Sequence, residues 1–126
     1  ILGSNERQNP WMDEGINSFY EERHIKTKYA DDRLIGKAKD KGINKFLGVD
    51  KFKPDDFLKI VYETVASYHL NQPLGIASTE YTSTNYGAVV YGKGGWATEY
   101  LSSYLGTEVF DKAMHVYFDR WKFKHP

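Results

Sequence analysis

Asn9-Pro10-Trp11-Met12-Asp13-Glu14-Gly15-Ile16-Asn17-Ser18-Phe19-Tyr20-Glu21-Glu22 is the stretch that decides the fold of this 126-residue chain. Proline suits the first position of a helix, and acidic side chains in the first turn complement the helix dipole. Pro10 is followed in this way by Asp13 and Glu14. The apolar side chains then recur at helical spacing, at Met12, Ile16, Phe19 and Tyr20. The pattern predicts a helix from about Pro10 to Lys28.

The same signals predict a second helix in the middle of the chain. Pro54, followed by two aspartates, marks its start, and it should end near Asn71, before Pro73. Its expected buried stripe is Phe57, Ile60, Val61, Val65 and Tyr68. The preceding stretch, from Ala30 to Lys53, is rich in lysine and glycine and predicts short helical turns and loop. Its lysines are typical of a solvated face and also suit a docking patch.

Two further helices are expected in the C-terminal third, after a Ser- and Thr-rich loop at residues 75–85. One should span Tyr86 to Leu105 and end at Gly106 in the left-handed conformation. Its expected buried side chains are Val89, Val90, Trp96, Ala97, Tyr100, Leu101 and Tyr104. Thr107 should cap the last helix, whose repeating apolar residues are Val109, Phe110, Ala113, Met114, Tyr117 and Trp121. The sequence therefore predicts an all-α fold, with residues 1–126 forming a single partial domain.

Composition excludes several classes of function. The 17 basic and 17 acidic residues give zero net charge, so nucleic acid and anionic membranes exert no general attraction. Cysteine is absent, which excludes disulfides, thiolate metal sites and a cysteine nucleophile. No apolar run is long enough to span a bilayer, and the first four residues are not a signal peptide. The absence of cysteine does not identify the cellular compartment of the protein.

Glu14 and Glu21 are the first candidate site residues. They lie two helical turns apart on one face, with polar Asn17 and Ser18 between them. A catalytic zinc ion can be held by two histidines and one carboxylate on a rigid element. The second ring nitrogen of each histidine needs a partner, which is often another carboxylate. Taken alone, the pair fits either such a site or a solvated helix face.

Trp11-Met12-Asp13-Glu14-Gly15 resembles the third-ligand helix of the aminopeptidase N family of zinc peptidases. The resemblance implies that Glu14 is a zinc ligand and that Glu21 orients a zinc-bound histidine. The family's His-Glu-x-x-His motif does not occur in the 126 residues. Family spacing would place it just upstream of Ile1. The chain is therefore expected to be the helical C-terminal lobe of a thermolysin-like metallopeptidase catalytic domain, without the upstream lobe.

Tyr91-Gly92-Lys93-Gly94 is similar to the Tyr-Glu-Lys-Gly box of the same family, with Gly92 in place of the usual Glu. The resemblance implies that the Tyr91 hydroxyl stabilises the oxyanion formed during peptide hydrolysis and that Tyr86 lies near the cleft. Residues 87–93 also satisfy the phosphate-loop pattern G-x-x-x-x-G-K. However, residue 94 is glycine where that loop needs Ser or Thr, and the polar stretch before it supplies no strand.

These resemblances imply part of a zinc-dependent aminopeptidase that removes residues from the N-termini of peptides. Zinc and a peptide would bind in the intact enzyme, whereas these residues alone would be inactive and bind zinc weakly. The face with Glu14, Glu21 and Tyr91 is expected to be exposed and to associate with a copy of itself. The alternative is a non-catalytic helical interaction module on a peptidase-like scaffold.

Overall fold

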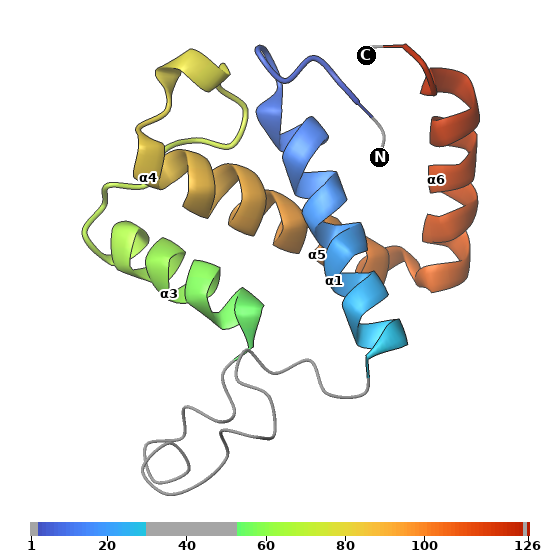
Figure 1. Ribbon diagram of the computed structural model, residues 1–126, viewed down its shortest axis with the longest axis horizontal. Coiled ribbons are helices and arrows are strands. Elements are labelled where there is room, and N and C mark those ends of the chain that lie inside the picture. Colours follow the sequence, from blue (N-terminus) through green and yellow to red (C-terminus); the bar gives the residue numbers. More distant parts are fainter. Residues whose placement is uncertain (1–2, 30–52, 125) are drawn as a thin grey trace, which may run out of the picture.

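The computed structural model describes residues 3–29, 53–124 and 126, and every regular element in these residues is helical (Figure 1). The all-α prediction is therefore confirmed for the described part, while the Lys- and Gly-rich stretch at residues 30–52 lies outside it. No helix in this part is long and apolar enough to cross a membrane. In chain order the elements are η1 (Trp11–Gly15), α1 (Ile16–Lys28), α3 (Pro54–Ser67), η4 (Ser78–Glu80), α4 (Ser83–Asn85), η5 (Tyr86–Lys93), α5 (Gly94–Leu105) and α6 (Thr107–Trp121).

All four predicted helices are present, and two of them begin with a π-helical segment. The first consists of η1 and α1, and the helix predicted from Tyr86 consists of η5 and α5. The π-helical geometry of η5 is seen in the hydrogen bond at its C-terminal end, where the Gly94 N–H donates to the carbonyl of Val89, five residues earlier. π-Helical turns are rare and occur frequently at functional sites. Side-chain periodicity does not distinguish them from α-helix.

The two composite helices cross with their backbones in contact at glycines. A Cβ added to Gly15 would lie 2.9 Å from two backbone atoms of Gly94. A Cβ added to Gly94 would lie 3.1 Å from the Cα of Gly15, and one on Gly95 would lie 3.4 Å from the Cβ of Ser18. Figure 1 shows α1 running across α5 at this point. The crossing explains why glycines stand inside a helix, where each costs about 1 kcal/mol relative to alanine.

The core gathers around this crossing. Its buried apolar side chains come from α1, η5 and α6 and are Phe19, Ala88, Val89, Val90 and Phe110. The Phe19 ring meets the Phe110 ring edge to face, with their centroids 5.4 Å apart. Such pairs add about 1 kcal/mol to the free energy of area burial. This contact joins the first helix to the last.

Several side chains predicted to be buried are exposed. On α3 these are Phe57 and Ile60, with Tyr68 just after its end; on α5, Ala97, Tyr100, Leu101 and Tyr104; and on α6, Val109 and Ala113. The reason is geometric, because in the described part each of these helices is covered along one side only. The helix α3 packs on η5, and α5 turns its small residues toward α1. Periodicity identified apolar stripes but not the side that another element covers.

Helix ends also differ from the predictions in detail. The helix α3 ends at Ser67, four residues before Asn71, and His69 follows with a positive φ of 56°. Gly106 does have a positive φ, of 80°, but its ψ of 143° lies outside the left-handed helical region. Thr107 is the first residue of α6 and does not cap it, since Gly106 occupies the N-cap position.

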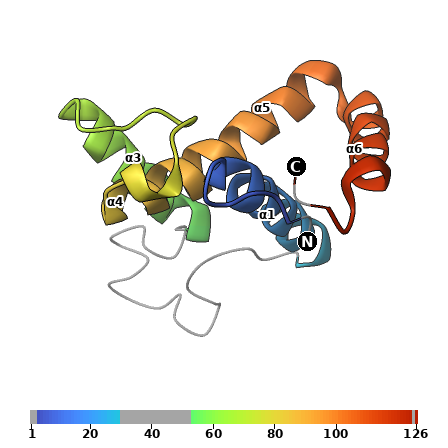
Figure 2. The same ribbon diagram turned by 90° about the horizontal axis from the view of Figure 1, so that it is seen from above.

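Beyond its junction with α5, α6 stands apart from α1 (Figure 2). A hollow of about 470 Å³ lies between them, and its apolar lining includes Ile16, Tyr20, Met114 and Phe118. Arg23 on α1 bridges to Asp111 on α6, with both guanidinium nitrogens donating to the two carboxylate oxygens. This bidentate bond fixes the angle between the two helices more firmly than a single contact would.

Replacing Gly15 by alanine should destabilise the fold by about 2 kcal/mol, because the new methyl group meets backbone that cannot move independently. Gly87 is the matched control, since an added Cβ there has no atom within 4 Å. Gly87→Ala should stabilise the protein by up to about 1 kcal/mol through the better helix propensity of alanine. Urea unfolding of both variants measures the two effects, and equal midpoints would contradict the close crossing.

Candidate functional site

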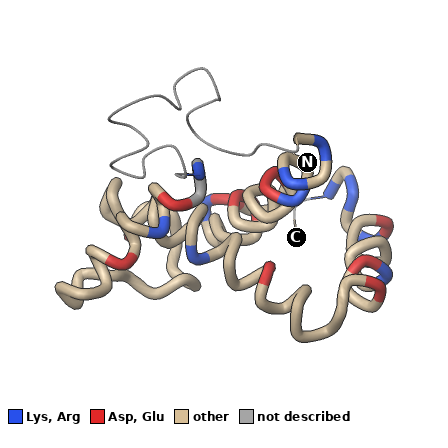
Figure 3. Tube along the Cα trace, turned by 90° about the horizontal axis from the view of Figure 1, so that it is seen from below, with Lys and Arg blue, Asp and Glu red and all other residues tan. Residues whose placement is uncertain are grey.

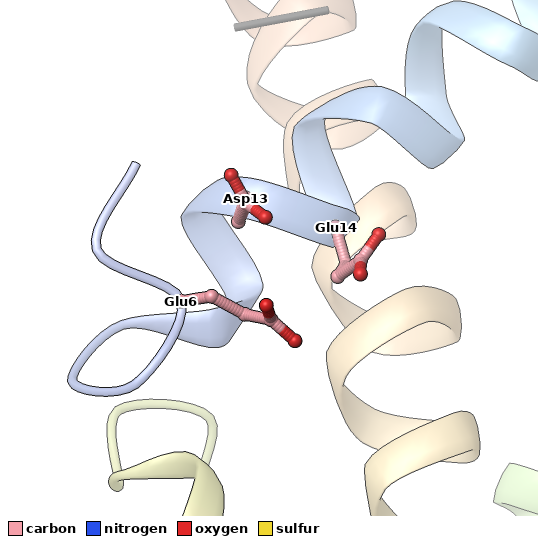
Figure 4. A group of neighbouring side chains, drawn as sticks. All are labelled: Glu6, Asp13 and Glu14. Carbon is pink, nitrogen blue, oxygen red and sulfur yellow. The ribbon is translucent and has the colours of Figure 1, made fainter. Parts of the chain in front are cut away.

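Three carboxylates converge at the N-terminal end of the first helix. Oxygen atoms of Glu6, Asp13 and Glu14 all lie within 4.8 Å of one another. Figure 4 shows Glu6 reaching from the N-terminal loop toward the two acidic residues of η1. The backbone N–H of Ser4 donates to Asp13 Oδ1 at 2.7 Å, which holds that loop against η1. Because like charges at this spacing repel, the cluster needs hydrogen-bond donors or a cation to stabilise it.

Two tyrosines of η5 supply such donors. The Tyr86 hydroxyl donates to Glu6 Oε1 at 2.7 Å, and Tyr91 lies close enough to Glu14 for that carboxylate to affect its pKa. Their rings lie edge to face, with centroids 6.0 Å apart. Each tyrosine therefore connects η5 to a different carboxylate of the cluster.

Burial and the neighbouring carboxylates raise the pKa of both phenols. Burial raises the pKa of Tyr91 to about 12, assisted by the neighbouring Glu14 carboxylate and by the negative charges of Glu6 and Asp13. Burial also raises the pKa of Tyr86, together with its hydrogen bond to Glu6 and the same kind of negative charge. Since a phenolate beside carboxylates is strongly disfavoured, both side chains act as neutral hydrogen-bond donors at neutral pH.

Glu21 lies near the cluster but does not belong to it. The side chain is exposed on α1 and has no hydrogen bond or ion pair with any residue that the structure describes. Together with Tyr91 it lines a hollow of about 170 Å³, whose apolar wall includes Leu58 and Trp96. Glu21 is therefore free to act on a group that enters this hollow.

Sequence reasoning found part of this arrangement. Of its candidates, Glu14, Tyr91 and Tyr86 meet in one cluster, and all three are half-buried, whereas only Glu21 is exposed as expected. Asp13 was interpreted only as a complement to the helix dipole. Glu6 carries no motif, because its approach depends on how the loop before η1 folds back. An acidic residue within a few positions of the Asp-Glu pair is the only signal that pointed to it.

The donor set fits a metal ion only in part. Three carboxylates are an all-oxygen set, which suits calcium, magnesium or manganese, whereas catalytic zinc sites contain imidazole. No histidine among the described residues joins the cluster. His24, the nearest along the chain, is exposed on α1. Glu14 thus fits one ligand position of a zinc site, and the described residues do not supply the others.

Comparison with protein families, with curated proteins and with solved structures found no match to this chain. The resemblance to the aminopeptidase N family therefore rests on residues 11–15 and 91–94 of the sequence.

Replacing Tyr91 by phenylalanine should change how stability depends on pH. The pKa of Tyr91 in the folded protein is raised above its ordinary value, so its contribution is complete below about pH 10 and is lost as the pH rises toward 12. The difference in unfolding free energy between wild type and Tyr91→Phe should be constant at neutral pH and shrink over that window. Urea unfolding at several pH values measures it.

Glu14→Gln provides the control for this prediction. Glu14→Gln removes a negative charge near Tyr91 but leaves Tyr91 buried. The pH range over which the stability contribution of Tyr91 is lost should therefore end at a lower pH, but it should not disappear. A difference between wild type and Tyr91→Phe that stays constant up to pH 12 would contradict the contact between Tyr91 and the carboxylates.

Proposed function

We propose that this chain is the helical lobe of a zinc-dependent aminopeptidase that hydrolyses N-terminal peptide bonds. The observation that carries the proposal is that Tyr91 and Glu14 lie close enough for the Glu14 carboxylate to raise the pKa of the tyrosine. These residues come from the two boxes that resemble the aminopeptidase N family, and they are 77 positions apart in the sequence (91 − 14). Nothing in the composition of either box requires them to touch. Their contact across the helix crossing is what a shared site would need.

The local structure suits the roles that the resemblance implies. Glu14 is fixed by η1, whose turn is reinforced where Ser18 Oγ donates to the Glu14 carbonyl at 2.9 Å. Tyr91 is held protonated, so its hydroxyl can donate to the negative oxygen of a tetrahedral intermediate. Glu21, exposed at the edge of the same hollow, can accept from the ring N–H of an incoming histidine. Glu14, Tyr91 and Glu21 would thus act together beside the crossing of the two composite helices.

Zinc, held by Glu14 together with two histidines of a His-Glu-x-x-His motif elsewhere in a longer protein, would supply a polarised carbonyl and an activated water. The described residues would contribute the third ligand, the histidine partner and the oxyanion donor. Aminopeptidase specificity rests on the family resemblance.

The alternative function is that of a non-catalytic helical interaction module on a peptidase-like scaffold. One observation favours it, namely the large apolar side chains that α5 exposes, because extended apolar surface marks interaction sites. The sequence immediately upstream of Ile1 in the parent gene discriminates between the two. A His-Glu-x-x-His motif there supports the enzyme, and its absence supports the module.

Zinc titration of the 126-residue chain should reveal only weak binding. Carboxylate ligands without imidazole are expected to give a Kd no tighter than about 10 µM. Glu14→Gln should weaken it further, whereas Glu99→Gln, which removes the charge beside Lys26 near the end of α1, should not. Isothermal titration calorimetry measures both, and one-to-one binding at sub-micromolar Kd would overturn the proposal that the site is shared with another segment.

Hydrolysis of an aminoacyl anilide by the parent protein tests the oxyanion role directly. Tyr91→Phe should lower kcat by about 10²–10³-fold with little change in KM, because the lost hydrogen bond forms only in the transition state. Tyr68→Phe, an exposed tyrosine on the loop after α3, is the control and should keep full activity. Unchanged kcat in Tyr91→Phe would contradict the assignment.

A further inference from the structure

The two sides of α5 are unlike each other. The side that faces α1 carries only small residues, Gly94, Gly95, Thr98 and Ser102, and all four are buried. The opposite side carries Ala97, Tyr100, Leu101 and Tyr104, which we call the α5 outer stripe, and all four are exposed. Helices of globular proteins normally turn their large apolar residues inward. Here the close crossing with α1 buries the side of α5 that carries small residues and leaves the side with the large apolar residues exposed.

The exposure of this stripe is large enough to need an explanation. Tyr100 is 75% exposed, Leu101 48% and Tyr104 78%. Their spacing of three and four residues places them on one continuous surface of the helix. No described element covers them, and none of them belongs to the carboxylate and tyrosine cluster. A contiguous apolar surface of this size on a helix indicates a docking face.

The charge pattern allows this face to meet a copy of itself. No Lys, Arg, Asp or Glu occurs from Tyr100 to Thr107, and Figure 3 shows the uncharged run between the acidic residues at either end. Glu99 turns toward α1, where its carboxylate accepts from Lys26 Nζ. Two outer stripes can therefore approach without placing like charges opposite each other.

We propose that two copies of this chain associate through their α5 outer stripes, packed antiparallel about a two-fold axis near Leu101. In this arrangement Leu101 of each copy lies at the axis against Leu101 of the other, and Tyr104 of each copy lies over Ala97 of the other. A two-fold contact uses the same patch on both copies, so a stripe of apolar residues without charge is self-complementary. The inference stands independently of the zinc site.

The area available sets the expected strength. Two stripes would bury roughly 1,000 Å² in total, which is the lower limit for a specific protein–protein interface. A dimer with a micromolar Kd is therefore expected, in place of an obligate one.

Sedimentation velocity on the wild-type chain, from about 1 to about 200 µM, tests the association across the expected Kd. Wild type should shift from monomer to dimer within this range, and Tyr104→Glu should raise the Kd at least tenfold. Phe57→Glu is the matched control, since Phe57 is 62% exposed on a different helix, α3, and this variant should dimerise like wild type. Far-UV circular dichroism should be identical for all three proteins, because both substitutions are at exposed positions.

The position of the axis can be tested by cross-linking, since the chain contains no cysteine. A disulfide needs Cα atoms within about 7 Å, so Leu101→Cys should oxidise to a covalent dimer and Phe57→Cys should stay monomeric. Three results would overturn the proposal: a strict monomer at the highest concentration, a Kd unchanged by Tyr104→Glu, or equal cross-linking at both cysteine positions. A strict monomer would assign the stripe to another segment of a longer protein.

Discussion

The contact between Gly15 and Gly94 is the constraint on which the rest of this structure depends. At these residues two helices touch backbone to backbone, and neither position has room for a methyl group. Side-chain packing normally holds helix axes 8–10 Å apart, and removing the side chains permits a closer approach. The π-helical segments η1 and η5 both lie at this crossing, so the backbone departs from regular α-helix where the helices meet.

The close approach also produces the candidate site. Because η1 and η5 are in contact, Glu14 on η1 lies close to Tyr91 on η5, and Glu6 on the loop before η1 accepts a hydrogen bond from Tyr86. Three carboxylates near one another are electrostatically costly, and two protonated phenols partly offset that cost. The same arrangement holds a carboxylate and a neutral donor side by side, as the proposed peptidase chemistry requires.

The crossing has a second consequence on the opposite side of α5. Since the small residues of this helix are used against α1, its large apolar residues must face outward. The buried core of the described part is correspondingly small and is made by Phe19, Phe110 and the valines of η5. The candidate site and the exposed α5 outer stripe therefore both follow from the same close helix crossing, although their proposed functions differ.

The sequence by itself determined where most helices begin and end, because Pro10, Pro54 and Gly106 act on the local backbone. It also singled out Glu14, Tyr91 and Tyr86, whose neighbours along the chain form recognisable boxes. Only the tertiary structure decided that these residues meet, that Glu6 and Asp13 join them, and that Tyr100 and Tyr104 face outward. The physical reason is that periodicity fixes which residues share a side of a helix, whereas the glycine contact fixes which side is covered.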